Sequence, residues 1–165
     1  MHNFKPQKIY LNKKTILVTG AGDGIGKQAA LHYASYGATV ILLGKTVVKL
    51  ESVYDEIINN GGNEPAIVPL DLKGATAKHY RDMANTINAQ SGCLYCLLHH
   101  ASVLGHLGPF SHFSEQDWQN LFQVNVTCQL LFTQAYLPYL TNAPQSSVIS
   151  PTYIVSLKVL AHWSM

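Results

Sequence analysis

The sequence predicts an α/β protein in three layers, with a doubly wound parallel β-sheet between helices on both faces. Short runs of Val, Ile, Leu and Thr alternate along the chain with stretches of helical pattern. The runs are continuously apolar, as expected of strands that a parallel sheet buries on both faces. Repeated β-α units with right-handed crossovers give a doubly wound sheet, whose ligand crevice lies beyond the carboxyl ends of the strands.

About five strands are expected, and each is recognised by its run of apolar and β-branched residues. Such residues fit a pleated, buried surface. In order along the chain, the strands are expected near residues 15–19, 38–43, 66–70, 93–98 and 146–149.

Four helices are expected between these strands, at about residues 25–36, 46–60, 75–90 and 114–137. The first ends at Gly37, the second at the Gly61-Gly62 pair and the last at Pro138, because glycine closes helices and proline interrupts them. Ser114 can cap the last helix through its hydroxyl. The sheet is expected to be incomplete at its C-terminal side.

A glycine-rich turn joins the first strand to the first helix, with Gly20, Gly24 and Gly26 in a G-x-x-x-G-x-G spacing. Glycines permit positive φ and let a pyrophosphate approach the backbone, while N–H groups at the helix start point toward the anion. The turn therefore predicts a nucleotide-binding strand, turn and helix. The alternative is a glycine-rich turn that holds no ligand.

The Thr19-Gly20-x-x-x-Gly24-Ile25-Gly26 pattern resembles the short-chain dehydrogenase/reductase family. The likeness covers about residues 8–149 and, within the family, is similar to the YciK-like oxidoreductases. It implies a Rossmann-type fold, with residues 1–149 as an NAD(P)-binding domain, and hydride transfer at an alcohol/carbonyl pair. Further segments that carry it are Tyr36–Lys45, Leu70-Asp71-Leu72, Leu97–Ser102 and Gln123-Val124-Asn125-Val126.

The resemblance implies cofactor-binding residues at the carboxyl ends of several strands. Asp71 would accept from the adenine amino group, although it can also be read as a helix cap or turn aspartate. Where the family usually has Asn-Asn-Ala-Gly, this chain has His99-His100-Ala101-Ser102. The implied cofactor-binding residues are Gly20, Asp23, Gly24, Ile25, Gly26, Lys45, Asp71, Leu72 and Ala101.

The end of the second strand favours NADP(H) over NAD(H). An NAD-binding site commonly has an acid there, whereas NADP calls for a cation beside the 2′-phosphate. Lys45 occupies this position, and no acid lies between Thr39 and Lys49. Two observations weaken the prediction, because Lys45 can also be a solvated lysine at a helix start and Asp23 places an acid in the glycine turn.

Of the family's catalytic residues, the resemblance assigns Asn125, which in relatives holds a water in a proton relay. A Ser, a Tyr and a Lys are expected after the fifth strand. Tyr153 falls at the place of the Ser, which puts the expected Tyr at about position 166, and Lys158 is one residue too late to pair with Tyr153 on one helical face. We therefore expect a catalytically incompetent fragment with a divergent tail at 150–165, produced by a frameshift or an early stop. The alternative is a non-catalytic dinucleotide-binding, interaction or remnant protein.

Composition indicates one domain and argues against several other classes. The chain has 165 residues, 47% of them apolar, and a net charge of +2 from scattered lysines, so neither a nucleic-acid surface nor a membrane span is expected. Cys93 and Cys96 form a C-x-x-C, but side chains three apart on a strand point to opposite faces, so no metal site is expected. With no signal peptide pattern, a cytoplasmic location is expected. Uncovered apolar faces of the last two strands and of the helix Leu121–Phe132 favour self-association.

Overall fold

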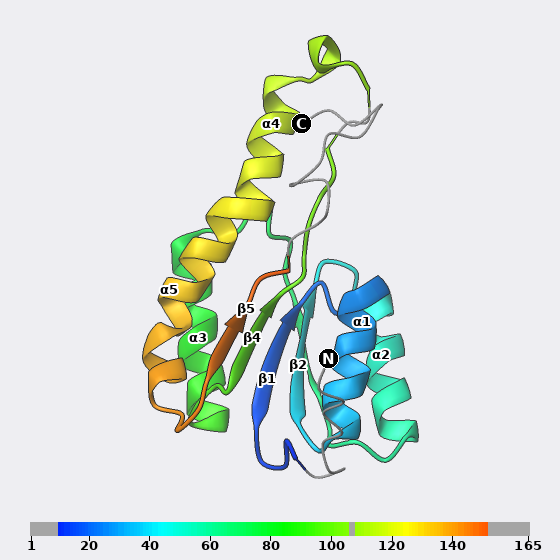
Figure 1. Ribbon diagram of the computed structural model, residues 1–165, viewed down its shortest axis with the longest axis vertical. Coiled ribbons are helices and arrows are strands. Elements are labelled where there is room, and N and C mark those ends of the chain that lie inside the picture. Colours follow the sequence, from blue (N-terminus) through cyan, green and yellow to red (C-terminus); the bar gives the residue numbers. More distant parts are fainter. Residues whose placement is uncertain (1–9, 106–107, 152–165) are drawn as a thin grey trace, which may run out of the picture.

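The computed structural model describes residues 10–105 and 108–151, in which five strands form one parallel sheet. The strand order is β3-β2-β1-β4-β5, so the order reverses between β1 and β4 (Figure 1). Thr15 pairs with Thr39 and Ile16 pairs with Cys96, on opposite sides of β1. The α/β fold predicted from the sequence is confirmed, with strands β1 (Thr15–Thr19), β2 (Thr39–Gly44), β3 (Ala66–Pro69), β4 (Cys96–His99) and β5 (Ser147–Ile149).

Helices cover both faces of the sheet. Helices α1 (Gly24–Ser35) and α2 (Val47–Asn59) lie on one face, and α3 (Ala77–Ser91) and α5 (Cys128–Thr141) on the other (Figure 1). Helix α4 (Glu115–Phe122) runs into α5 through a π-helical turn, η2 (Gln123–Thr127), and a 3₁₀ turn, η1 (Phe110–His112), precedes α4. The long helix extends past the carboxyl ends of the strands (Figure 1).

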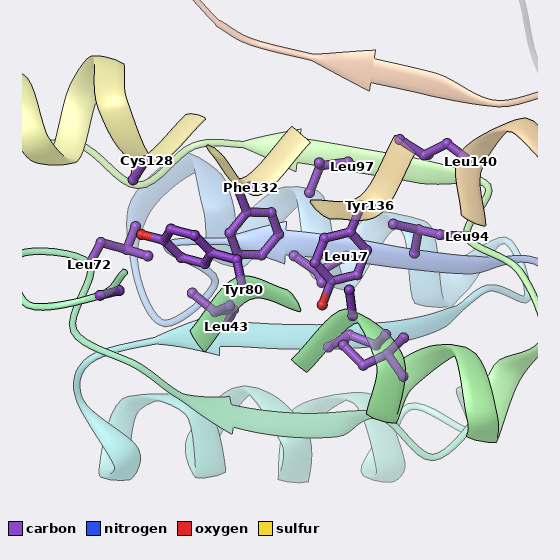
Figure 2. Close-up of a cluster of buried hydrophobic side chains, with 14 of the residues drawn as sticks. Leu17, Leu43, Leu72, Tyr80, Leu94, Leu97, Cys128, Phe132, Tyr136 and Leu140 are labelled. Carbon is purple, nitrogen blue, oxygen red and sulfur yellow. The ribbon is translucent and has the colours of Figure 1, made fainter. Parts of the chain in front are cut away.

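The alternation of side chains along the strands divides the core into two clusters. Ile16 and Val18 of β1 face α1 and α2, whereas Leu17 faces α3 and α5. In the second cluster the aromatic rings of Tyr80, Phe132 and Tyr136 meet between the two helices and the sheet (Figure 2). The rings of Phe132 and Tyr136 stack with centroids 4.9 Å apart, which adds aromatic packing to the burial of apolar area.

Two sequence expectations about these elements were wrong in detail. Pro138 does not end the last helix, because α5 continues to Thr141. Proline near a helix end forfeits only the bond to the carbonyl of Gln134, and Leu140 beyond it is 2% exposed in the core, so burial favours the extra turn. Strand β4 begins at Cys96 rather than at Cys93, which lies before it and is only partly buried.

The apolar side chains of the helix Leu121–Phe132, expected to lack cover, are partly buried and partly exposed. Val124 and Phe132 are buried against the core, contrary to the expectation. Phe122, Val126 and Leu130 are exposed, as expected, and β5 exposes Val148 and Ile149. Together with Trp118 these three form a row of side chains four residues apart, between 40% and 59% exposed, along the long helix. We call this row the exposed helix row: Trp118, Phe122, Val126 and Leu130.

Candidate functional site

The glycine turn after β1 packs directly on the turn after β4. Gly20 has φ of 70°, and a Cβ there would lie 2.9 Å from the Cα of Ala101. A Cβ on Gly26 would overlap the carbonyl oxygen of Gly20 and lie 2.8 Å from Cδ2 of His100. Glycine is therefore required at both positions, because side chains would push the two turns apart. The result is a cradle of bare backbone at the point where the strand order reverses.

Thr19 fixes the second of these turns, a role that the sequence reasoning missed. Its hydroxyl oxygen accepts hydrogen bonds from the N–H groups of His100, at 3.0 Å, and Ala101, at 3.1 Å. The same hydroxyl donates to the carbonyl of Leu98 at 3.4 Å, and the side chain is 2% exposed. The sequence did carry a signal for this role, because Thr19 is a hydroxyl residue at the end of an apolar strand, directly before Gly20.

The start of α1 is capped by Asp23, whose carboxylate has two partners. One oxygen accepts from the N–H of Gly24, the first residue of the helix, at 2.8 Å. The other lies 2.5 Å from the ammonium of Lys49 on α2. The hydrogen bond from Lys49 is the main cause that lowers the pKa of Asp23, followed by the bond from Gly24. Sequence reasoning proposed Asp23 but did not include Lys49.

A cavity of about 360 Å³ lies between the carboxyl ends of β1, β2 and β4. It brings together every cofactor-binding residue predicted from the sequence except Ile25 and Gly26, which lie in the adjoining start of α1. Ile25 is 64% exposed beside the opening of the turn. Lining residues that the sequence reasoning did not include as cofactor-binding are Gly22, Leu43, Gly44, Thr46, Lys49, Leu50, Leu70, Lys73, His100, Ser102, Val103 and Val124.

Charged side chains that follow β2 and β3 line this cavity. Lys45, directly after β2, is exposed at one side. Asp71 is exposed and accepts a hydrogen bond from the N–H of Lys73 at 3.0 Å, while Leu72 is buried. Asp71 therefore makes the turn contact that the alternative interpretation foresaw and also lines the cavity.

The two histidines after β4 have different surroundings. His99 is 5% exposed, shares a hydrogen bond with the hydroxyl of Thr133 at 2.9 Å and meets the ring of Phe132 edge to face. Burial lowers the pKa of His99 to about 4. His100 lines the cavity, and burial lowers its pKa as well. The imidazole of His99 is therefore uncharged at neutral pH, and burial disfavours the charged form of His100 as well.

Asn125 lies in the π-helical turn η2 and faces the loop that follows β4. Its Oδ1 accepts from the N–H of Val103 at 2.9 Å, and its Nδ2 donates to the carbonyl of Val103 at 2.8 Å. The carboxamide thus anchors that loop to the long helix. π-Helical turns often occur at functional sites. The expected loss of activity rested on the positions of Tyr153 and Lys158. Both lie outside the described residues.

A family model described as short chain dehydrogenase matches residues 14–165. The chain belongs to the short-chain dehydrogenase family. The uncharacterized oxidoreductase YciK of Escherichia coli is 40% identical over 99% of this chain, which spans 64% of the length of YciK. The structure of a short chain dehydrogenase from Pseudomonas syringae superposes with a TM-score of 0.93, at 37% identity, over 99% of this chain and 67% of that one. A short chain dehydrogenase from E. coli in complex with NADPH is 40% identical, with a TM-score of 0.90, over 96% of this chain and 66% of that one.

The site of this family member fits a dinucleotide by its own geometry. Gly20 and Gly26 let the neighbouring turns close on one another, while a Cβ on Gly24 would meet no atom within 4 Å. The open space at Gly24 adjoins the start of α1 and the two lysines that line the cavity. In the part of the chain that the structure describes, no three His, Cys, Asp or Glu side chains are grouped as metal ligands. In the same part, every helix is too short or too polar to cross a membrane.

Proposed function

We propose that this chain is the NADP(H)-binding part of an oxidoreductase that transfers a hydride between the dinucleotide and an alcohol/carbonyl pair. The observation that carries the proposal is the glycine cradle, closed by Ala101 and placed beside a cavity with Lys45 at its β2 side. The NADPH complex of a relative 40% identical to this chain supports the choice of cofactor.

Each of the predicted residues would contact a different part of the cofactor. Gly24 would leave room for the pyrophosphate, since a Cβ there would meet no atom within 4 Å, and Gly20 and Gly26 would let the turn keep its closed shape beside it. The N–H of Ile25 at the start of α1 would donate to the pyrophosphate. Lys45 would pair with the 2′-phosphate. Ala101 would lie along the nicotinamide ribose. Asp71 would accept from the adenine amino group and the N–H of Leu72 would donate to a ring nitrogen.

When bound, NADPH supplies the hydride, so the protein must supply a proton to the carbonyl oxygen. Asn125 is proposed to hold a water for this relay. Since its carboxamide already binds both main-chain groups of Val103, the water would use the second lone pair of Oδ1 or the main-chain carbonyl. The side chain therefore positions the relay and does not itself donate the proton.

We further propose that residues 1–165 alone do not turn over carbonyl substrates. A Tyr-x-x-x-Lys spacing occurs at Tyr10 and Lys14, but these residues precede β1, at the end of the sheet away from the cavity. Along the described residues, the cavity lining includes no tyrosine. His100 lines the cavity, but burial lowers its pKa and so disfavours the imidazolium form that would serve as a general acid.

Fluorescence titration tests the cofactor assignment. NADPH is expected to bind more tightly than NADH, and Lys45→Asp is expected to erase or reverse that difference because a carboxylate repels the phosphate and suits a free ribose. Lys78→Asp, which changes the charge equally on α3, is the control and should leave the preference intact. Equal affinities in the unmodified chain would contradict the assignment.

Turnover is tested with the same protein. No oxidation of NADPH is expected across a panel of ketones, aldehydes and quinones. Grafting on the segment that follows β5 in a longer relative is expected to give activity, which Asn125→Leu should reduce. Reductase activity that depends on Tyr153 in the 165-residue chain would overturn this part of the proposal.

Two further expectations belong to the same proposal. We place the protein in the cytoplasm, where NADP(H) is available. We also propose that the chain associates with itself through the exposed helix row, since an apolar row of that length favours burial.

A further inference from the structure

Two lysines lie close together along the chain at the β2 side of the cavity. Lys45 follows the last residue of β2, and Lys49 lies in the first turn of α2. Both line the cavity. Helix α2 has no acid in its first turn, and its cap residue Thr46 makes no capping hydrogen bond through its side chain. This side of the cavity therefore offers positive charge from two side chains and from a helix start.

The two lysines differ in their partners. Among the residues that the structure describes, no ion pair is formed by Lys45, whereas Lys49 pairs with Asp23 at 2.5 Å. The pair joins the glycine turn to α2, across 26 residues of sequence. Its side chains are 54% and 76% exposed. An exposed pair of this kind contributes little net stability, so a stronger anion can displace the carboxylate.

We propose that Lys49 is a second cation for the 2′-phosphate of NADP(H), and that Asp23 holds Lys49 as an internal competitor until the phosphate displaces it. The inference rests on the proposed cofactor function and adds a specificity-determining residue to it. A phosphate monoester carries between one and two negative charges near neutral pH, which two ammonium groups balance and one does not. NADH has no such phosphate and leaves the Asp23–Lys49 pair in place.

A second role for the pair makes the opposite prediction. If Asp23 and Lys49 only latch the glycine turn onto α2, both dinucleotides need the latch equally. Breaking the Asp23–Lys49 pair would then weaken the binding of NADPH and of NADH equally. If Asp23 competes with the phosphate, removing the charge of Asp23 strengthens the binding of NADPH alone. The sign of the change therefore separates the two roles.

The experiment compares Asp23→Asn, Lys49→Gln and the double variant with the unmodified chain, by titration with NADPH, NADH and the fragment 2′-AMP. Asparagine is a good N-cap, so Asp23→Asn removes the charge and keeps the cap of α1. Asp23→Asn is expected to tighten NADPH and 2′-AMP binding about two- to five-fold. Lys49→Gln is expected to weaken both about five- to ten-fold. NADH should change by less than about two-fold in each variant, and the double variant should lose the gain of Asp23→Asn.

Lys78→Gln serves as the control, because Lys78 pairs with Asp82 on α3 and does not line the cavity. Equal weakening of NADPH and NADH in Asp23→Asn would overturn the inference in favour of the latch. Unchanged NADPH affinity in Lys49→Gln would also overturn it, while an NADPH preference in the unmodified chain would leave the proposed function standing. An unmodified chain without that preference would overturn both.

Discussion

The hydroxyl of Thr19 accepts two consecutive main-chain N–H groups from the turn after β4. Thr19→Val keeps the shape of the side chain and removes the acceptor, which leaves both N–H groups without this partner. The free energy of unfolding is expected to fall by about 1–3 kcal/mol, measured by urea denaturation. Thr15→Val, at the other end of β1, is the control, since no hydrogen bond of the Thr15 side chain occurs in the described part of the chain. An equal fall in the free energy of unfolding of both variants would show that the hydrogen bonds from His100 and Ala101 do not stabilise the fold.

His99 gives the stability of the fold a pH dependence of definite sign. Its folded pKa of about 4 lies below the ordinary value of 6.5. Between these pH values the unfolded chain binds a proton that the folded chain does not, so stability falls as pH falls through this window and is unaffected above it. The loss from His99 is expected to reach about 2–3 kcal/mol at pH 4.

His99→Gln is expected to flatten this part of the stability curve between pH 6.5 and pH 4, as measured by urea denaturation at each pH. His32→Gln, on the exposed side of α1, should leave it unchanged. A curve for His99→Gln that parallels the unmodified chain would show that another group causes the acid sensitivity.

At the scale of elements, the π-helical turn η2 is the feature that the sequence pattern did not predict. The pattern predicted one helix over 114–137, because apolar spacing fits a π turn within a long helix as well as it fits a regular one. Asn125 was placed by its resemblance to a family motif, yet its bonds to Val103 depend on where the loop after β4 lies. Local sequence carries no information about that distance.

Asn125→Leu tests whether this carboxamide anchors the loop after β4. Both bonds to Val103 are lost, so hydrogen exchange at the N–H of Val103 is expected to accelerate, with a loss of about 1–3 kcal/mol in stability. Gln123→Leu, in the same turn, breaks a bond to the carbonyl of Ala75 and should leave exchange at Val103 unchanged. Unchanged protection of Val103 in Asn125→Leu would contradict the anchoring role.

The strands and the glycine turn followed from the sequence because each is encoded locally, by a continuous apolar run or by glycines at fixed spacing. Contacts between distant segments did not follow. Lys49 was missed because its partner Asp23 lies in the distant glycine turn, and Pro138 was misjudged because burial of Leu140 favours continuing the helix. The correct predictions thus concern single elements, and the corrections concern how elements meet.

For the whole molecule, the exposed helix row predicts self-association. Leu130→Glu places a charge in the middle of this apolar row and is expected to shift the chain toward monomer in sedimentation velocity at micromolar concentration. Val48→Glu is the matched control, because Val48 is an apolar residue of α2 that is 74% exposed and lies outside the row. A chain that is monomeric without any substitution would contradict the prediction.

The sheet order also has a consequence for synthesis on the ribosome. Strands β1, β2 and β3 are sequential neighbours and can pair as soon as they emerge, but the turn that closes the cradle lies 81 residues after Thr19 in sequence. Pairing of β1 with β4 is a long-range contact, which forms slowly because a long loop must close first. A nascent chain that has not yet released Ala101 from the exit tunnel therefore has the glycines without their counterpart. Binding of a dinucleotide can stabilise this protein only late in translation.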